Sequence, residues 1–165
     1  MHIYWNWVIG MKKTRYLLWI FAVESVGILS GLLTRQGTKR YQLLAIKPPL
    51  TPPGIIFPIV WTILYGLMGI SAARVAAAPE SRARSAGLNV FVTQLIFNFF
   101  WSLIFFNAQA YGFALLWLIM MWVLILVMIL HFRKVDMTAA RLQIPYLFWV
   151  TFAAFLNFGV WRLNS

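Results

Sequence analysis

The sequence contains no cysteine and few charged residues. The absence of cysteine excludes a disulfide framework and any thiolate-based site. Charged residues make up 10% of the chain and hydrophobic residues 62%, whereas a soluble domain has roughly 25% charged residues. Because so few charges cannot cover the surface of a soluble globule, the composition predicts an integral membrane protein.

Acidic residues are especially scarce: the chain has three Asp and Glu residues and 14 Lys and Arg residues, which gives a net charge of +11. The basic residues do not form a stripe for nucleic acid; they gather in short segments between apolar runs, as is typical of membrane proteins. We therefore expect membrane lipid as a partner and no nucleic acid. No cluster of His, Asp and Glu has metal-ligand spacing, so no metal site is predicted, and His2 and His131 are interpreted as interfacial residues.

The apolar runs divide the chain into five spans, each near the roughly 20 residues that cross a bilayer. Residues 85–130 carry no formal charge and exceed one span, so the polar residues and glycine within residues 107–112 mark a break between two helices. The predicted fold class is an all-α membrane protein, a five-transmembrane-helix bundle with a long loop between helices 1 and 2. It forms a single domain over residues 1–165, in which residues 1–15 are a short N-terminal extension. The expected helices cover residues 17–33, 55–77, 86–106, 111–131 and 142–161.

The long polar loop is expected over residues 35–53. Two proline pairs, Pro48-Pro49 and Pro52-Pro53, force an extended backbone there. Loops of this length in compact proteins are usually functional or mobile. We expect the apolar residues of this loop to fold over the mouth of the bundle as a lid.

The second expected helix carries an aromatic stripe, because Pro58, Trp61, Tyr65 and Met68 recur at roughly helical spacing. A rigid proline-rich loop thus leads into a helix with aromatic rings on one face. Such a stripe suits packing against a neighbouring helix as well as the wall of a ligand cavity, and both interpretations stay open at this point.

Several polar residues within the spans must face protein rather than lipid. Glu24 shares a face with Gly27 and Gly31, and these glycines form a small-x-x-x-small pattern that lets another helix approach closely. The Glu24 carboxyl is either a structural group hydrogen-bonded to a neighbouring helix or a contact for a ligand or proton. In the third helix, a polar face that recurs every four residues is expected to look into the bundle; it consists of Gln94, Asn98 and Ser102.

Five spans place the two termini on opposite sides of the membrane. The N-terminal side holds about nine basic residues and the other side about five, counted from the 14 in the chain. Because cytoplasmic loops carry the excess of Lys and Arg, we expect a cytoplasmic N-terminus, with the long loop and the C-terminus outside.

Four segments carry a family resemblance. They are Tyr41 with Lys47-Pro48 and the following Pro52-Pro53, FPIVWTILYGLMG at residues 57–69, NFFWSLIFF at residues 98–106, and PYLFWVTFAAFLN at residues 145–157. In this order they resemble the TspO/MBR family of tryptophan-rich sensory proteins and translocator proteins, also called the peripheral-type benzodiazepine receptor family. The resemblance covers nearly the whole chain. It implies a homodimer of five-helix bundles in a bacterial cell membrane, each with a ligand cavity under the long loop.

The resemblance also implies the ligand, a porphyrin such as protoporphyrin IX or haem, with no other cofactor. A flat apolar macrocycle suits stacked aromatic rings with a few polar groups that fix its orientation. Trp61 and Trp149 match the tryptophans that the family links to porphyrin chemistry. Carried onto this sequence, the ligand-binding residues would be Phe57, Trp61, Tyr65, Asn98, Trp101, Phe113, Trp149, Ala153 and Leu156.

The chain departs from the family pattern in the loop and near the C-terminus. Where the family usually has loop tryptophans, this chain has Arg40, Pro49 and Leu50, and Ile55. This departure weakens porphyrin binding from the lid side and leaves the cavity wall intact. The C-terminal sterol pattern has Phe158 in place of its tyrosine, so sterol recognition is not predicted.

The favoured function is therefore a tetrapyrrole-binding membrane protein that acts as a sensor, regulator or carrier. The alternatives are a light-dependent enzyme that degrades protoporphyrin IX, which the resemblance implies for some bacterial members, and a small transporter or assembly partner. Glu24, Glu80 and Asp136 are far apart in the sequence and predict no acid–base site, so no catalytic residue is assigned. A single intramembrane acid without a paired basic residue gives little support for proton-coupled transport.

Overall fold

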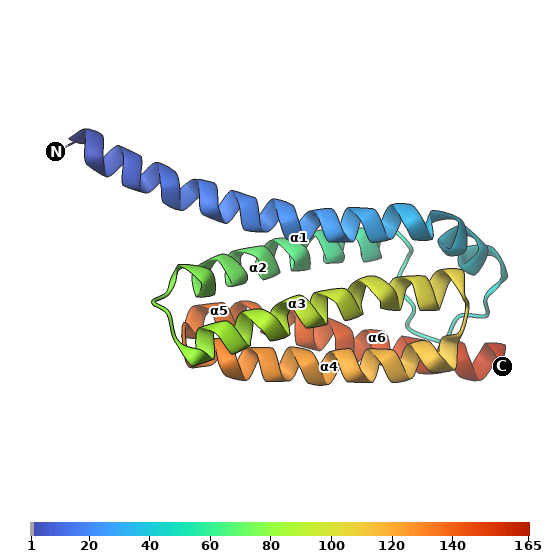
Figure 1. The fold of residues 1–165 in the computed structure, drawn as a ribbon. Helices are drawn as coiled ribbons and strands as arrows, with labels where there is room; N and C mark the ends of the chain where they lie inside the picture. Colours follow the sequence, from blue (N-terminus) through green and yellow to red (C-terminus); the bar gives the residue numbers. More distant parts are fainter. Residues whose placement is uncertain (1) are drawn as a thin grey trace.

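The computed structural model describes residues 2–165, with side chains from Lys13 onward. Five of its helices are long and apolar enough to cross a membrane, which confirms the predicted all-α membrane fold. These helices lie side by side with the two termini at opposite ends of the bundle (Figure 1). The elements are α1 (His2–Leu44), α2 (Ile56–Ala77), α3 (Arg82–Ser102), the π-helical turn η1 (Leu103–Asn107), α4 (Tyr111–Arg133), α5 (Met137–Leu142) and α6 (Ile144–Asn164).

Helix α1 differs most from the sequence prediction. It begins at His2 and runs on to Leu44, so residues 2–15 of the expected N-terminal extension are helical and continuous with the first span. The predicted long loop over residues 35–53 is therefore wrong in its first half, and the connection to α2 is confined to residues 45–55, here called the proline-rich segment. Polarity alone does not distinguish a loop from a helix that continues beyond the membrane, because a helix in water is free to expose polar side chains.

Packing against η1 holds the last turns of α1 in helical form. The Tyr41 ring lies edge-on to Phe105 and Phe106, at centroid distances of 5.3 and 5.5 Å. The Asn107 amide donates a hydrogen bond to the Leu33 carbonyl oxygen at 3.0 Å. A Cβ added to Gly37 would lie 2.5 Å from the Phe106 carbonyl oxygen, so the two helices meet backbone to backbone there. These contacts join residues far apart in the sequence and stabilise a helix that its composition does not predict.

The proline-rich segment is attached to the end of α6. The side-chain amide of Asn164 accepts a hydrogen bond from the Ile46 N–H at 2.9 Å and donates one to the Ile46 carbonyl oxygen at 2.9 Å. Pro48 is buried against Gly159, where an added Cβ would lie 2.6 Å from the Pro48 ring. The segment is thus anchored across one end of the bundle rather than left free in solvent.

The predicted break between the third and fourth helices is confirmed, because α4 begins at Tyr111 after the π-helical turn. At the other end of α4, the short helix α5 occupies most of the connection between the fourth and fifth spans, for which no helix was predicted. Asp136 caps this short helix by accepting a hydrogen bond from the Ala139 N–H at 2.9 Å, and it pairs with Arg74 of α2 at 2.9 Å. A side chain that satisfies a free N–H in the first turn favours a helix at this point.

The apolar core lies along α4, where Leu118, Met121, Ile125 and Met128 are fully buried. Methionine fits such an interior because its unbranched chain fills irregular gaps between helices. On the other side of the bundle, α1 and α2 approach closely at Gly69, where an added Cβ would lie 2.6 Å from the Ile20 Cα. Small residues at helix crossings allow this packing within a membrane.

Candidate functional site

A cavity of about 960 Å³ lies between α1, α2, α3 and α6, beneath the proline-rich segment. We call it the central cavity. Residues of the proline-rich segment, among them Lys47, Thr51 and Pro52, contribute to its lining, so this segment covers one end as the expected lid would. The volume is at the upper end of the roughly 300–1,000 Å³ that is usual for small-molecule pockets.

Most of the ligand-binding residues predicted from the sequence meet at this cavity. Those that line it are Phe57, Trp61, Tyr65, Trp101, Ala153 and Leu156. They come from α2, α3 and α6, which are separated along the chain and brought together by the bundle. The structure therefore supplies a single concave surface for these residues. Their contact with a ligand stays a prediction.

The Trp61 and Tyr65 rings form the aromatic wall contributed by α2. They stack at a centroid distance of 5.4 Å and an interplanar angle of 30°. Trp61 is half-buried, whereas Tyr65 is 6% exposed. Tyr65 thus packs into the bundle while both rings border the cavity, so the geometry fits both interpretations of the stripe.

Asn98 stands behind this wall rather than in the cavity lining. Its side-chain oxygen accepts a hydrogen bond from the Tyr65 hydroxyl at 2.6 Å, and its amide donates one to the Tyr146 hydroxyl at 2.9 Å. Tyr146 in turn donates to the Gln94 side-chain oxygen at 2.9 Å. This buried chain confirms that Gln94 and Asn98 face the interior, and it gives Asn98 a role in orienting the Tyr65 ring.

A second group of aromatic rings at the cavity comes from the end of α3 and from η1. The Trp101 ring stacks on Phe105 at 5.2 Å, and its indole N–H donates to the Asn157 side-chain oxygen at 3.2 Å. Asn157 also donates to the Tyr111 carbonyl oxygen at 2.8 Å. Phe105 and Phe106 both line the cavity, and sequence reasoning did not include them among the ligand-binding residues. The signal was present in NFFWSLIFF, but the π-helical turn that sets the direction of these two rings was not evident from spacing.

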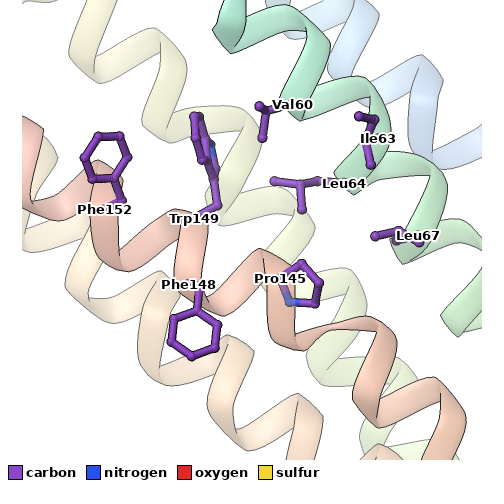
Figure 2. Close-up of a pocket in the computed structure, with 8 residues that line it drawn as sticks. All are labelled: Val60, Ile63, Leu64, Leu67, Pro145, Phe148, Trp149 and Phe152. Carbon is purple, nitrogen blue, oxygen red and sulfur yellow. The ribbon is translucent and has the colours of Figure 1, made fainter. Parts of the chain in front are cut away.

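Trp149 lies elsewhere, in a groove of about 440 Å³ between α2 and α6 that we call the lateral groove. Figure 2 shows Trp149 beside Phe152 on α6, facing Val60 and Leu64 on α2. The Trp149 ring contacts Phe57 edge-on at 5.9 Å. Because Phe57 lines the central cavity, Trp149 reaches that cavity through Phe57 and not directly.

Phe113 does not lie at the central cavity. It is 53% exposed on α4, where its ring lies 6.0 Å from that of Trp117. The resemblance assigned it to the pocket, but the start of α4 presents this ring to the outside of the bundle.

The charges around the central cavity are separated along α1. Glu24 lines the cavity near Gly66, where an added Cβ would lie 3.7 Å from a carboxylate oxygen. Arg35 and Lys39 line it about three and four turns further along the same helix, and Arg35 lies about 16 Å from Glu24 along the helix axis. Glu24 therefore faces protein rather than lipid, as predicted, and it also lines the cavity.

The chain matches the model of the TspO/MBR family over residues 19–162. It is 35% identical over 141 residues to the tryptophan-rich protein TspO of Chlorobaculum tepidum, covering 85% of this chain and 89% of that protein. It is 40% identical over 119 residues to the protein CrtK of Rhodobacter capsulatus, covering 72% and 74% of the two chains. A translocator protein of Bos taurus is 30% identical over 141 residues, which cover 84% of this chain and 83% of that protein.

Proposed function

Because the chain belongs to the TspO/MBR family, we propose that it binds a tetrapyrrole, a porphyrin or haem, in the central cavity and acts as a membrane sensor, regulator or carrier. The observation that carries this proposal is the cavity itself. It measures about 960 Å³ and is lined by two groups of aromatic rings, Trp61 and Tyr65 from α2 and Trp101 and Phe105 from α3 and η1.

The chemistry of the walls suits a flat apolar ring system. Aromatic side chains bury large apolar areas and prefer offset-stacked or edge-to-face contacts. The Trp61–Tyr65 stack offers such a surface, and the hydrogen bond from Tyr65 to Asn98 keeps it in place. A rigid wall reduces the ordering cost of binding.

The covering segment contributes no indole to the site. Thr51, Pro52 and Ile55 line the cavity from above, and Ile55 stands where the family usually has a tryptophan. The segment therefore offers no aromatic surface, and we expect the stacking contacts of a tetrapyrrole to come from the helix-borne rings.

The proposal is tested by titrating the purified protein in neutral detergent with protoporphyrin IX. We expect saturable quenching of tryptophan fluorescence near one ligand per chain, together with a shift in porphyrin absorbance. Trp61→Ala should weaken binding by about fivefold or more, since a stacked aromatic contact contributes roughly 1 kcal/mol. Nine tryptophans are present, so the fluorescence signal survives the loss of one.

Trp149→Ala is the matched control, because it removes the same side chain from the lateral groove. We expect a smaller effect, transmitted through Phe57. Unsaturable partitioning that is the same in wild type and Trp61→Ala would overturn the proposal.

We further propose a homodimer in a bacterial cell membrane with a cytoplasmic N-terminus. The orientation is supported by the division of the 14 basic residues, about nine on the N-terminal side and five on the other. The absence of native cysteine makes single-cysteine labelling specific. Ser165→Cys should react with an impermeant maleimide on intact spheroplasts and Thr138→Cys only after permeabilisation; the opposite pattern would reverse the orientation.

Crosslinking in native membranes should give a dimer, and a monomer alone would contradict the proposed homodimer.

A further inference from the structure

Three basic side chains converge on the covered end of the central cavity. Arg35 and Lys39 lie one helical turn apart on α1, and Lys47 comes from the proline-rich segment. All three residues are solvent-exposed, and all three also contribute to the cavity lining. The cavity is therefore aromatic along its length and positively charged at its mouth.

The side-chain carboxylates of the chain do not neutralise this mouth. Of the three acidic residues, Asp136 pairs with Arg74 and Glu80 lies near Arg84. These pairs involve the loops at the opposite end of the bundle, where α2 and α4 end (Figure 1). Glu24 lines the cavity about three turns below Arg35. The positive charges thus remain available to a ligand.

The donors at the mouth also have unused capacity. Lys47 donates one hydrogen bond, to the Gln42 carbonyl oxygen at 2.9 Å, and its ammonium lies 5.9 Å from the Tyr41 ring centroid. An ammonium has three N–H donors, so two remain, and an arginine fork binds a carboxylate or phosphate through two parallel hydrogen bonds. Like charges that line one mouth repel each other, and the attraction of a bound anion to each of them offsets that repulsion.

We propose that Arg35, Lys39 and Lys47 form an anion clamp that holds the acidic group of an amphipathic ligand at the mouth while its apolar body lies against the aromatic rings. This inference rests on the proposed function and specifies its ligand class: the ligand carries a free anionic group on a flat or elongated apolar body. The shared chemistry is a carboxylate on a tetrapyrrole or a phosphate on a phospholipid. The clamp sets the orientation, acid outward and ring system inward.

The test compares protoporphyrin IX with its dimethyl ester, which keeps the macrocycle and removes both negative charges. We expect the free acid to bind wild-type protein about tenfold more tightly than the ester, and this advantage to shrink as salt rises from about 0.05 to 0.5 M, because exposed charges are screened. Arg35→Gln combined with Lys39→Gln should remove most of the advantage. The acid-to-ester affinity ratio is compared between wild type and variants, because the different partition of the two compounds into detergent is the same for each protein and cancels.

The matched control is Arg40→Gln combined with Arg162→Gln. Arg40 follows Lys39 on α1, and Arg162 lies in the last turn of α6, which is attached to the proline-rich segment through Asn164 and Ile46. This pair changes the net charge equally, but neither residue lines the cavity. The control should keep the acid-to-ester ratio of the wild type, and thermal unfolding should show that both double variants are folded.

A second arm distinguishes the two sources of the anion. If phosphatidylglycerol displaces the free acid from wild type while phosphatidylcholine does not, the clamp also takes a phospholipid headgroup. Without such competition it holds the carboxylate of the macrocycle. Equal affinity for acid and ester, or an equal loss in the control variant, would overturn the clamp while leaving the tetrapyrrole site in place. The absence of saturable binding by either compound would overturn the proposed function and the clamp together.

Discussion

A single added methyl group at Gly27 should disturb the aromatic wall of the central cavity. A Cβ at this position would lie 2.6 Å from Cδ2 of Tyr65, well inside van der Waals contact. The Tyr65 ring is 6% exposed, stacks on Trp61 and donates to Asn98 at 2.6 Å. Because the ring is packed on its other sides and borders the central cavity, Gly27→Ala should push it toward that cavity and weaken the hydrogen bond to Asn98.

The size of the effect follows from three contributions. Overpacking a dense interior costs about 1–3 kcal/mol, and a side-chain hydrogen bond between membrane helices contributes about 0.6–1.7 kcal/mol. Replacing a helical glycine by alanine returns up to about 1 kcal/mol. The net loss in free energy of unfolding should therefore be about 1–4 kcal/mol.

Gly31→Ala is the matched control on the same helix face. No atom lies within 4 Å of a Cβ added there, so this variant should be as stable as wild type or more stable by up to about 1 kcal/mol. Both are measured by unfolding in mixed micelles with increasing sodium dodecyl sulfate, followed by circular dichroism. If Gly27→Ala proves as stable as Gly31→Ala, the close contact between α1 and the Tyr65 ring is not a feature of the protein in solution.

Two further predictions concern the ends of the bundle. Burial alone would raise the pKa of Asp136, but hydrogen bonds from backbone N–H groups and the Arg74 guanidinium outweigh it and hold that pKa below its usual value. The stability that this carboxylate contributes is therefore fully present above about pH 4, its unfolded pKa, and is lost as pH falls through the folded pKa. The difference in melting temperature between wild type and Asp136→Asn should therefore become smaller on acidification. A difference that does not change with pH would contradict the ion pair. Asn164→Ala removes both hydrogen bonds to Ile46, and each contributes about 0.5–1.5 kcal/mol. Amide hydrogen exchange across residues 45–55 should therefore accelerate about 5- to 150-fold. Asn89→Ala is the control and should leave this exchange unchanged. Unaltered exchange in Asn164→Ala would show that the proline-rich segment is held by other contacts.

The number and positions of the spans follow from the sequence, because bilayer thickness sets the length of an apolar helix. The break at residues 107–112 was predictable for the same reason, since one span cannot use all of residues 85–130. The inward face of α3 was also predictable: amides such as those of Gln94 and Asn98 cannot be left unpaired in lipid, and both are buried. Helical spacing likewise identified Trp61 and Tyr65 as one face of α2.

Tertiary structure decided how far each helix runs and which faces meet. The last turns of α1 are helical because Tyr41 and Gly37 pack against η1, and a polar composition does not reveal a partner so distant in the chain. Trp149 and Ala153 are four residues apart and share a face of α6, yet Trp149 lines the lateral groove and Ala153 the central cavity. The meeting of Arg35, Lys39 and Lys47 at one mouth arises in the same way. The sequence determines periodicity and hydrophobic length, which are local properties, whereas the neighbours of a side chain depend on how whole helices cross, and only the packed bundle specifies that.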